Sequence, residues 1–264
     1  MKIRKAKPSD KNAVLAFCHN TFRWGDYIAN VWDSWIVKKD LLTIEINKKP
    51  VGICNASFSR NQVWIEGIRI NPKFRKKGYA SRLVIKTESN AKKKGKKLSR
   101  MIIARWNLRS MRMAKSLGYQ LEDMWWLYNL KPKKQSSKAR IITKVKNAGD
   151  FLTSSTYSES WKWLPLNKQE LERLCKKGRI IAFFQDGNAK AIGIWNKSSI
   201  DDGVLQLGFL SGTNLGIKHI LYFMQNKAHE QGSNRIQILA QQKIALKVPC
   251  IDRRMLFCLV KKDL

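Results

Sequence analysis

Acidic residues are scarce in this chain of 264 residues. Asp and Glu number 19 against 52 Lys and Arg, which gives a formal net charge of +33. The excess is densest between residues 71 and 100, where Glu88 stands against twelve basic residues. Such a field attracts polyanions, including nucleotide cofactors, nucleic acid and acidic protein surfaces. A solvated lysine-rich surface is the plainer interpretation, so the charge by itself does not identify a partner.

Histidine and paired cysteines are also rare. The three histidines lack metal-ligand spacing, and the five cysteines are odd in number and form no Cys-x-x-Cys pair. These patterns argue against a metal site and a disulfide framework, and they favour a reduced, cytoplasmic compartment. No apolar run approaches the ~18 residues of a membrane span, and the N-terminus has no apolar signal region. We therefore expect a cytoplasmic protein that contacts no membrane.

The chain divides into two halves with the same order of elements. In each half a strong strand leads through a glycine-containing turn into a long helix and a further strand. The sequence predicts a domain at 1–130, a basic linker at 131–139 and a degenerate copy of the first domain at 140–264. The expected fold class is α/β (α+β), with a mixed, mostly antiparallel sheet flanked by helices in two tandem domains.

The expected elements follow from periodicity, capping residues and turns. In the first half we expect strands at 1–6, 41–46, 51–58, 63–70, 99–106 and 124–130, and helices at 13–22, 26–37, 79–94 and 110–118. In the second half we expect strands at 140–145, 180–185, 190–195, 204–210, 235–240 and 255–261, and helices at 166–178 and 215–232.

The segment that carries chemistry is residues 68–84, where a strand enters a basic turn that opens a helix. Backbone N–H groups at the start of a helix have no intrahelical partners, and with the helix dipole they favour a phosphate. Gly78 allows close approach of the backbone, Ala80 keeps the next position small, and Arg75, Lys76 and Lys77 add positive charge.

The run from Arg75 to Ala80 resembles the Arg/Gln-x-x-Gly-x-Gly/Ala signature of the GNAT acyltransferases. The preceding strand and proline turn, Arg69 to Pro72, are similar to those that lead into the signature. Downstream, Asn107 to Ser110, Met113 and Leu117-Gly118-Tyr119 are similar to the asparagine-led helix of the family and its closing Gly-aromatic pair. Order and spacing agree across residues 2–130.

The resemblance implies acetyl-CoA or another short acyl-CoA as the cofactor. In this family the fourth strand separates from the fifth, and the pantetheine arm lies between them. The implied cofactor-binding residues lie on the strand, in the basic turn and at the start of the asparagine-led helix: Ile68, Arg69, Ile70, Arg75, Lys76, Lys77, Gly78, Tyr79, Ala80, Ser81 and Asn107.

Acyl transfer to a primary amine requires a base, because an ordinary lysine-type amine is protonated at neutral pH. Glu66, in the strand at 63–70, is the catalytic candidate. Strict alternation predicts Glu66, Ile68 and Ile70 on one face of the strand and Ile65, Gly67 and Arg69 on the other. Many GNAT enzymes carry a tyrosine as acid for the thiolate where this chain has Ala114, so water is a candidate for that role. Cys54 fits a buried core thiol better than a nucleophile.

A second acidic segment, 24–33, is the candidate for acceptor binding through Trp24, Asp26, Tyr27 and Asp33. Helix capping is the plainer interpretation of both aspartates. Together with the Glu66 strand, this segment resembles a GNAT subgroup that includes free-histidine N-acetyltransferases, which favours a small amino acid as acceptor. The global positive charge favours an acceptor on something acidic, such as a ribosome.

The leading interpretation is an acetyl-CoA-dependent N-acetyltransferase that acts in a ternary complex on a protein N-terminus, a lysine or a small amine. The alternative is a basic nucleic-acid- or ribosome-associated protein on the same scaffold, with little catalysis. A third interpretation is a structural homodimer or regulator in which the basic turn senses acyl-CoA, and Ala114 favours it.

Overall fold

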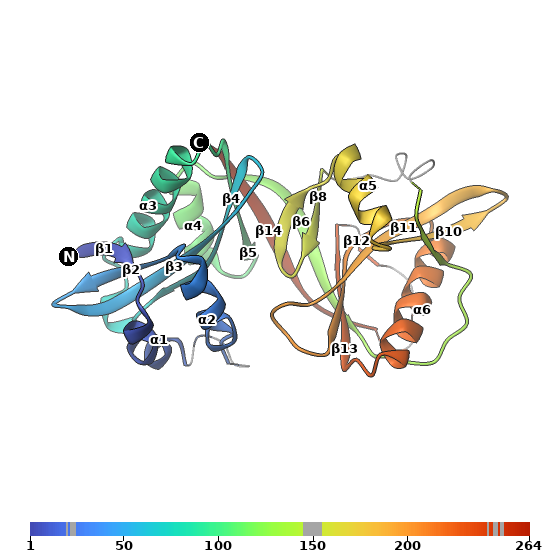
Figure 1. Ribbon diagram of the computed structural model, residues 1–264, viewed down its shortest axis with the longest axis horizontal. Coiled ribbons are helices and arrows are strands. Elements are labelled where there is room, and N and C mark those ends of the chain that lie inside the picture. Colours follow the sequence, from blue (N-terminus) through green and yellow to red (C-terminus); the bar gives the residue numbers. More distant parts are fainter. Residues whose placement is uncertain (20, 22–24, 145–154, 242, 245–247, 249–250) are drawn as a thin grey trace. The chain divides into compact units, whose positions relative to one another are not determined.

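The computed structural model describes residues 1–19, 21, 25–144, 155–241, 243–244, 248 and 251–264 (Figure 1). They form two compact units: unit 1 contains Met1–Glu122 with Leu259–Leu264, and unit 2 contains Asp123–Cys258. This division lies before the predicted boundary at residue 130, so residues 131–139, predicted as the linker, are part of unit 2. The segment Leu259–Leu264 belongs to unit 1 although it follows unit 2 in the chain. The sequence did not indicate this.

The sheet of unit 1 is mixed and mostly antiparallel, which confirms the predicted fold class. Its strands lie in the order β1 (Lys2–Lys5), β2 (Leu41–Ile46), β3 (Lys49–Ser59), β4 (Gln62–Ile70) and β5 (Leu98–Ala104). Strands β1 to β4 pair antiparallel, whereas β4 and β5 are parallel. The end of strand β14 (Ile251–Asp263) follows β5 in the sheet.

Helices cover both faces of this sheet (Figure 1). They are α1 (Lys11–Cys18), α2 (Ile28–Lys38), α3 (Tyr79–Lys93) and α4 (Leu108–Ser116), with short 3-10 turns at Pro8–Asp10 and Pro72–Phe74. Helix α2 buries Ile28, Val31, Trp32 and Trp35, whose spacing along the chain places them on one face of a helix. Helix α3 packs on β2, β3 and β4 and buries Leu83, Val84 and Ala91.

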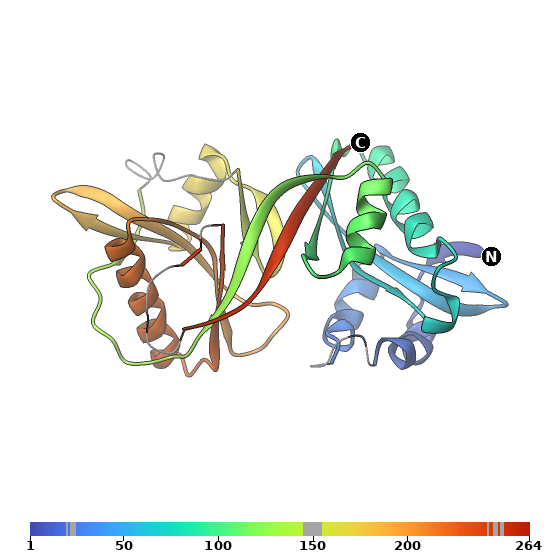
Figure 2. The same cartoon turned by 180° about the vertical axis from the view of Figure 1, so that it is seen from behind.

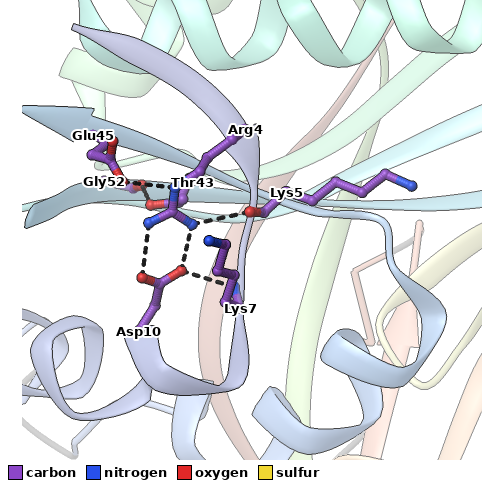
Figure 3. Close-up of polar contacts among 7 residues, drawn as sticks. All are labelled: Arg4, Lys5, Lys7, Asp10, Thr43, Glu45 and Gly52. Carbon is purple, nitrogen blue, oxygen red and sulfur yellow. Dashed lines mark hydrogen bonds and ion pairs between the residues drawn. The ribbon is translucent and has the colours of Figure 1, made fainter. Parts of the chain in front are cut away.

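A buried ion pair fixes the entry of the chain into α1 (Figure 3). Arg4 on β1 donates to both carboxylate oxygens of Asp10 at 2.7 and 2.9 Å, and to Glu45 on β2 at 2.7 Å. The Lys7 N–H also donates to Asp10. Burial alone would raise the pKa of Asp10, but the bonds from Arg4 and Lys7 outweigh it and lower that pKa. Asp10 therefore anchors the start of α1 on the first two strands.

In unit 2 the strands lie in the order β6-β13-β12-β11-β10-β7, with β14 beside β6 (Figure 2). The strands are β6 (Gln120–Leu130), β7 (Arg140–Ile142), β10 (Ile180–Gln185), β11 (Asn188–Lys197), β12 (Val204–Gly212) and β13 (Arg235–Ala240). Helix α6 (Asn214–Glu230) packs on β10 to β13, and α5 (Lys168–Lys176) precedes β10. All of these elements were expected, although β7 is shorter than predicted.

One element of unit 2 was not expected. Strands β8 (Thr156–Glu159) and β9 (Lys162–Pro165) form an antiparallel hairpin through Ser160 and Trp161, both at positive φ. The hairpin packs on β12 so closely that a Cβ on Gly208 would lie 1.8 Å from the Ser158 carbonyl oxygen. Its Trp163 is fully buried and meets Trp125 edge to face, so this tryptophan is part of the core.

Candidate active site

A β-bulge in β4 sets the direction of the candidate catalytic side chain. Glu66 lies opposite Asn55 of β3, whereas Arg69 lies opposite Ile53, so β4 contains one residue more than β3 over this interval. Gly67 adopts φ +64° at this point. A Cβ there would lie 2.4 Å from the Trp35 ring of α2, so both the backbone conformation and the packing require glycine.

The bulge shows that the strict alternation predicted for β4 is wrong beyond Glu66. Because Asn55 and Ile53 share a face of β3, their partners Glu66 and Arg69 share a face of β4. Ile70 lies opposite Gly52 on the other face. Glu66 and Arg69 therefore face the side covered by α2, while Cys54, which alternates with Asn55, contacts Thr87 of α3 on the opposite side.

Glu66 is half-buried and held by two neutral donors from β3. The Asn55 Nδ2 and the Ser57 Oγ both donate to its Oε1, each at 3.0 Å. Asn55 and Ser57 are not among the site residues predicted from the sequence. The register of the β3–β4 hairpin could have identified Asn55 as a neighbour of Glu66, because pairing of Ser59 with Gln62 at the turn places Asn55 opposite Glu66.

Asp26 and Arg69 form a buried, bidentate ion pair on the same side of the sheet. Arg69 donates to the two Asp26 oxygens at 2.7 and 3.0 Å, and Asp26 also accepts the Ile28 N–H at the start of α2. Burial alone would lower the pKa of Arg69, but the Asp26 partner raises it. The charge of the Asp26 carboxylate is thus compensated by Arg69. The bond from the Ile28 N–H is a helix-capping contact, as the plainer interpretation of Asp26 expected.

Tyr27 contacts this ion pair through the Arg69 side chain. Its ring meets Trp35 edge to face at 6.2 Å, and the Arg69 guanidinium lies 5.4 Å from the ring centroid. Burial raises the pKa of Tyr27, Glu66 and Asp26 raise it further, and Arg69 and the Gly67 N–H oppose the shift. Tyr27 is therefore a neutral hydroxyl beside the Glu66 carboxyl group.

The other two predicted acceptor residues do not join this cluster. Asp33 is 80% exposed and pairs with Lys11 of α1. It lies about 160° around α2 from Trp35, the side chain that meets Gly67, because each helical residue turns about 100°. Trp24 lies outside the described residues.

The N-terminus of α3 has the features predicted for a phosphate cradle. Gly78 is its N-cap, at φ +73° with no side-chain cap, and a Cβ there would meet nothing within 4 Å. Arg82 makes the first bond of the helix, to the Gly78 carbonyl. Within the described part of the chain, the N–H groups of residues 76–81 donate to no acceptor. The turn is therefore open, uncapped and flanked by positive charge.

Two of the basic side chains at this turn also support its conformation. Arg75 Nε donates to the Ile70 carbonyl at 3.1 Å, which closes the strand end against the turn. The Lys77 Nζ lies 5.7 Å from the Phe74 ring centroid. Lys76 is exposed and takes φ +62°. All three residues lie directly before Gly78, the N-cap of α3.

Strands β4 and β5 pair only at their beginnings. The pairing joins Gln62, Val63 and Trp64 to residues 98–100, although both strands continue beyond these positions. The predicted separation of the fourth and fifth strands is therefore present. Ile68 and Ile70 lie in the separated part, and their carbonyls accept hydrogen bonds from Arg69 and Arg75.

The asparagine-led helix forms as α4. The Asn107 side chain accepts the Ser110 N–H at 3.2 Å, so its oxygen caps the helix. Ala114 is buried and supplies no proton. Tyr119 is also buried, and its hydroxyl is bonded to Ser99 at 2.5 Å; burial is the main cause that raises its pKa.

Cys54 is fully buried beneath α3, and burial raises the pKa of its thiol to about 12. This confirms a core thiol rather than a nucleophile. Among the described residues, no group of three or more His, Cys, Asp or Glu side chains could hold a metal ion. No helix in the same residues is long and apolar enough to span a membrane.

Unit 2 keeps the framework of this site without its chemistry. Strands β12 and β13 are parallel and pair from Val204 to Leu207, and β12 is bulged at Gly208. Leu207 precedes that glycine, as Glu66 precedes Gly67 in unit 1. The start of α6 is capped by the Thr213 hydroxyl, which accepts the Gly216 N–H at 3.2 Å. That unit 2 is a degenerate copy of unit 1 stays a prediction.

Comparison with known proteins agrees with this geometry. Residues 13–119 match the acetyltransferase (GNAT) family. No curated protein matches the sequence. Similar solved structures include a protein described as an acetyltransferase from Thermoplasma acidophilum, with TM-score 0.69, 13% identity and 100% of both chains covered.

A GCN5-related N-acetyltransferase from Sphaerobacter thermophilus has TM-score 0.63 and 11% identity, covering 99% of this chain and 95% of its own. A protein described as an acetyltransferase from Pyrococcus horikoshii has TM-score 0.60 and 14% identity, covering 100% of this chain and 89% of its own. These structures show the fold over both units. Residues 13–119 therefore carry the match to the acetyltransferase (GNAT) family within this fold.

Proposed function

We propose that unit 1 transfers an acetyl or other short acyl group from its CoA thioester to a primary amine, by direct attack in a ternary complex. The observation that carries this proposal is the N-terminus of α3, where an open, left-handed Gly78 precedes uncapped N–H groups beside Arg75, Lys76 and Lys77. This arrangement fits a pyrophosphate. The separated part of β4 and Asn107 would hold the pantetheine arm. The thioester supplies the activated acyl group.

Glu66 is the proposed general base. It is held on β4 by Asn55 and Ser57, and it takes a proton from the acceptor amine. The acidic side chains that could compete with it in unit 1 are engaged elsewhere. Each pairs with Lys or Arg: Asp10, Asp26, Asp33, Asp40, Glu45, Glu88 and Glu122. Because Ala114 offers no proton, we assign protonation of the leaving thiolate to water.

Titration of acetyl-CoA into the protein by calorimetry tests the cradle. We expect saturable binding that persists at moderate salt and is lost in Gly78→Glu, whose carboxylate would stand among the phosphate-binding N–H groups. Gly95→Glu is the matched control, because Gly95 also has positive φ and open space, at the other end of α3. Binding that falls with salt equally in all three proteins would indicate the polyanion-binding alternative instead.

Turnover with defined acceptors tests the base and the acceptor class. Poly-L-lysine represents protein amines, and free histidine represents small amino acids. Glu66→Gln keeps the shape of the side chain and removes the base, so we expect a loss of ~10²–10⁴-fold in kcat with normal acetyl-CoA binding. Undiminished turnover would exclude Glu66 as the base.

A further inference from the structure

Helix α4 and the turn before it carry positive charge without any acid. Residues 101–121 contain no Asp or Glu and four basic residues, all of them exposed: Arg105, Arg109, Arg112 and Lys115. The nearest acids on either side are occupied, because Glu88 pairs with Lys262 and Glu122 pairs with Arg100. Among the described residues, no ion pair reaches the four basic side chains, so their charge is directed at the solvent.

The exposed side chains of α4 lie on one face of the helix, which is on the viewer's side of the unit 1 sheet in Figure 2. At about 100° per residue, a sector of ~120° contains all of them: Leu108, Arg109, Arg112, Lys115 and Ser116. Ala114, on the opposite side of the helix, is buried. We call this sector the α4 face. Its three cations recur every ~4.5 Å along the axis, close to the ~3.4 Å axial spacing of phosphates along one nucleic-acid strand.

Trp106 directly precedes α4 and stands apart from the other tryptophans. It is 58% exposed, and among the described residues it is the one exposed Phe, Tyr or Trp side chain. The turn that presents it is ordered, because the Trp106 carbonyl accepts the Leu108 N–H at 3.0 Å and the Asn107 N–H donates to the Ala104 carbonyl at 2.8 Å. The Asn107 side chain turns back to cap α4, whereas Trp106 stays open to solvent. A large apolar ring held in water beside a row of cations is typical of a binding surface.

We propose that Trp106 and the α4 face form a binding surface for single-stranded nucleic acid. The cations contact successive phosphates, and an unpaired base stacks on the Trp106 ring. A duplex keeps its bases stacked on one another, and an anionic lipid surface has no base, so neither ligand would use both features. This surface does not depend on acyl transfer, and it adds a second activity to the one proposed above.

Fluorescence anisotropy of a labelled oligouridylate tests the role of Trp106. The probe has about 12 nucleotides, within the range of sites that bind single strands. In Trp106→Ala the stacking partner is lost, and we expect the affinity to fall about tenfold or more with an unchanged salt dependence, because no charge is removed. Trp106→Phe keeps an aromatic ring and should lose less. A hairpin RNA, whose bases are paired, should bind Trp106→Ala and the wild type equally.

The salt dependence of the same binding tests the α4 face. Arg109→Ala/Arg112→Ala removes two phosphate contacts, so the slope of log K against log salt should become shallower by about 1.4, at ~0.7 per contact on a single strand. Lys168→Ala/Lys176→Ala is the matched control, because it removes the same charge from exposed positions of α5. We expect its slope to stay close to that of the wild type.

Circular dichroism shows whether each variant is folded, and calorimetric titration of acetyl-CoA shows whether the cofactor site is intact. Full affinity of Trp106→Ala for the oligouridylate, or equal losses in the two double variants, would overturn the inference and leave only the attraction of the global charge. Loss of acetyl-CoA binding in Trp106→Ala would assign this ring to the cofactor and would also overturn it. So would vesicles of equal parts phosphatidylserine and phosphatidylcholine that displace the oligouridylate, since a lipid surface would then be the better ligand.

Discussion

At the scale of single residues, Gly67 decides where Glu66 points. Its positive φ makes the bulge, and the space that a Cβ would need is filled by the Trp35 ring. The sequence shows a glycine after a glutamate in a strand, but it does not show on which side of the sheet the next residues lie. Glu66 and Gly78 could be predicted from their motif. The pairing of Arg69 with Asp26 could not, because it depends on the bulge.

We expect Gly67→Ala to destabilise the protein by ~2–4 kcal/mol, through a left-handed backbone and a clash in a packed core. Gly95→Ala shares the positive φ but meets nothing within 4 Å, so it should cost only ~1–2 kcal/mol. Urea unfolding of the two variants measures the difference, which isolates the contact with Trp35. Equal losses in both would contradict the packing argument.

The buried thiol of Cys54 gives a pH dependence with a definite sign. Burial raises its pKa from 9.0 to about 12, so the folded state holds the proton more tightly than the unfolded state. The resulting stability is fully present below pH 9 and is lost as the pH rises towards 12, at about 1.4 kcal/mol per pH unit. Urea unfolding between pH 8 and pH 11 should therefore show a shallower decline in Cys54→Ala than in the wild type. An identical slope would show that the thiol ionises without opposing folding.

At the scale of elements, most helices and strands were predictable because their apolar periodicity is strong. The spacing of Ile28, Val31, Trp32 and Trp35 identifies the buried face of α2 correctly. The β8–β9 hairpin was missed for a physical reason. Its turn is formed by Ser160 and Trp161 at positive φ, where glycine or asparagine is usual, and buried polar contacts hold it, such as that of the Ser160 N–H with Gln206 at 2.8 Å.

The last segment of β14 belongs to unit 1 and is anchored there by several contacts. Leu259 and Val260 are buried, Lys262 bonds Glu88 at 2.7 Å, and the Leu264 N–H bonds the Lys97 carbonyl. Deletion of residues 259–264 exposes apolar surface and leaves Glu88 buried without its partner. We expect a loss of ~5 kcal/mol or more.

Thermal unfolding of the deletion variant, with acetyl-CoA binding as a second readout, checks this expectation. Lys262→Met removes the charge but keeps most of the strand, so it should lose only the part due to Glu88. Wild-type stability in the deletion variant would show that unit 1 does not depend on this strand.

At the scale of the whole molecule, the charge of +33 opposes compaction. Seven acidic side chains of unit 1 are paired, yet most Lys and Arg residues have no acid to meet, since 52 of them face 19 acids. We expect the melting temperature to rise when NaCl is increased from about 20 mM to about 500 mM, because the repulsion is long-ranged and screening shortens its reach. A fall in melting temperature would mean that the ion pairs, rather than the repulsion, dominate the salt response.

The return of Leu259–Leu264 to unit 1 has a consequence for biosynthesis. A ribosome makes residues 1–122 first, but the strand that completes their sheet emerges only after all of unit 2. At translation rates of roughly 5–20 residues per second, the sheet of unit 1 lacks the end of β14 for on the order of ten seconds. During that interval β5 presents an open edge to other nascent chains. The sheet of unit 1 is therefore completed only after unit 2 has been made, and a chain that lacks residues 259–264 has an unfinished domain.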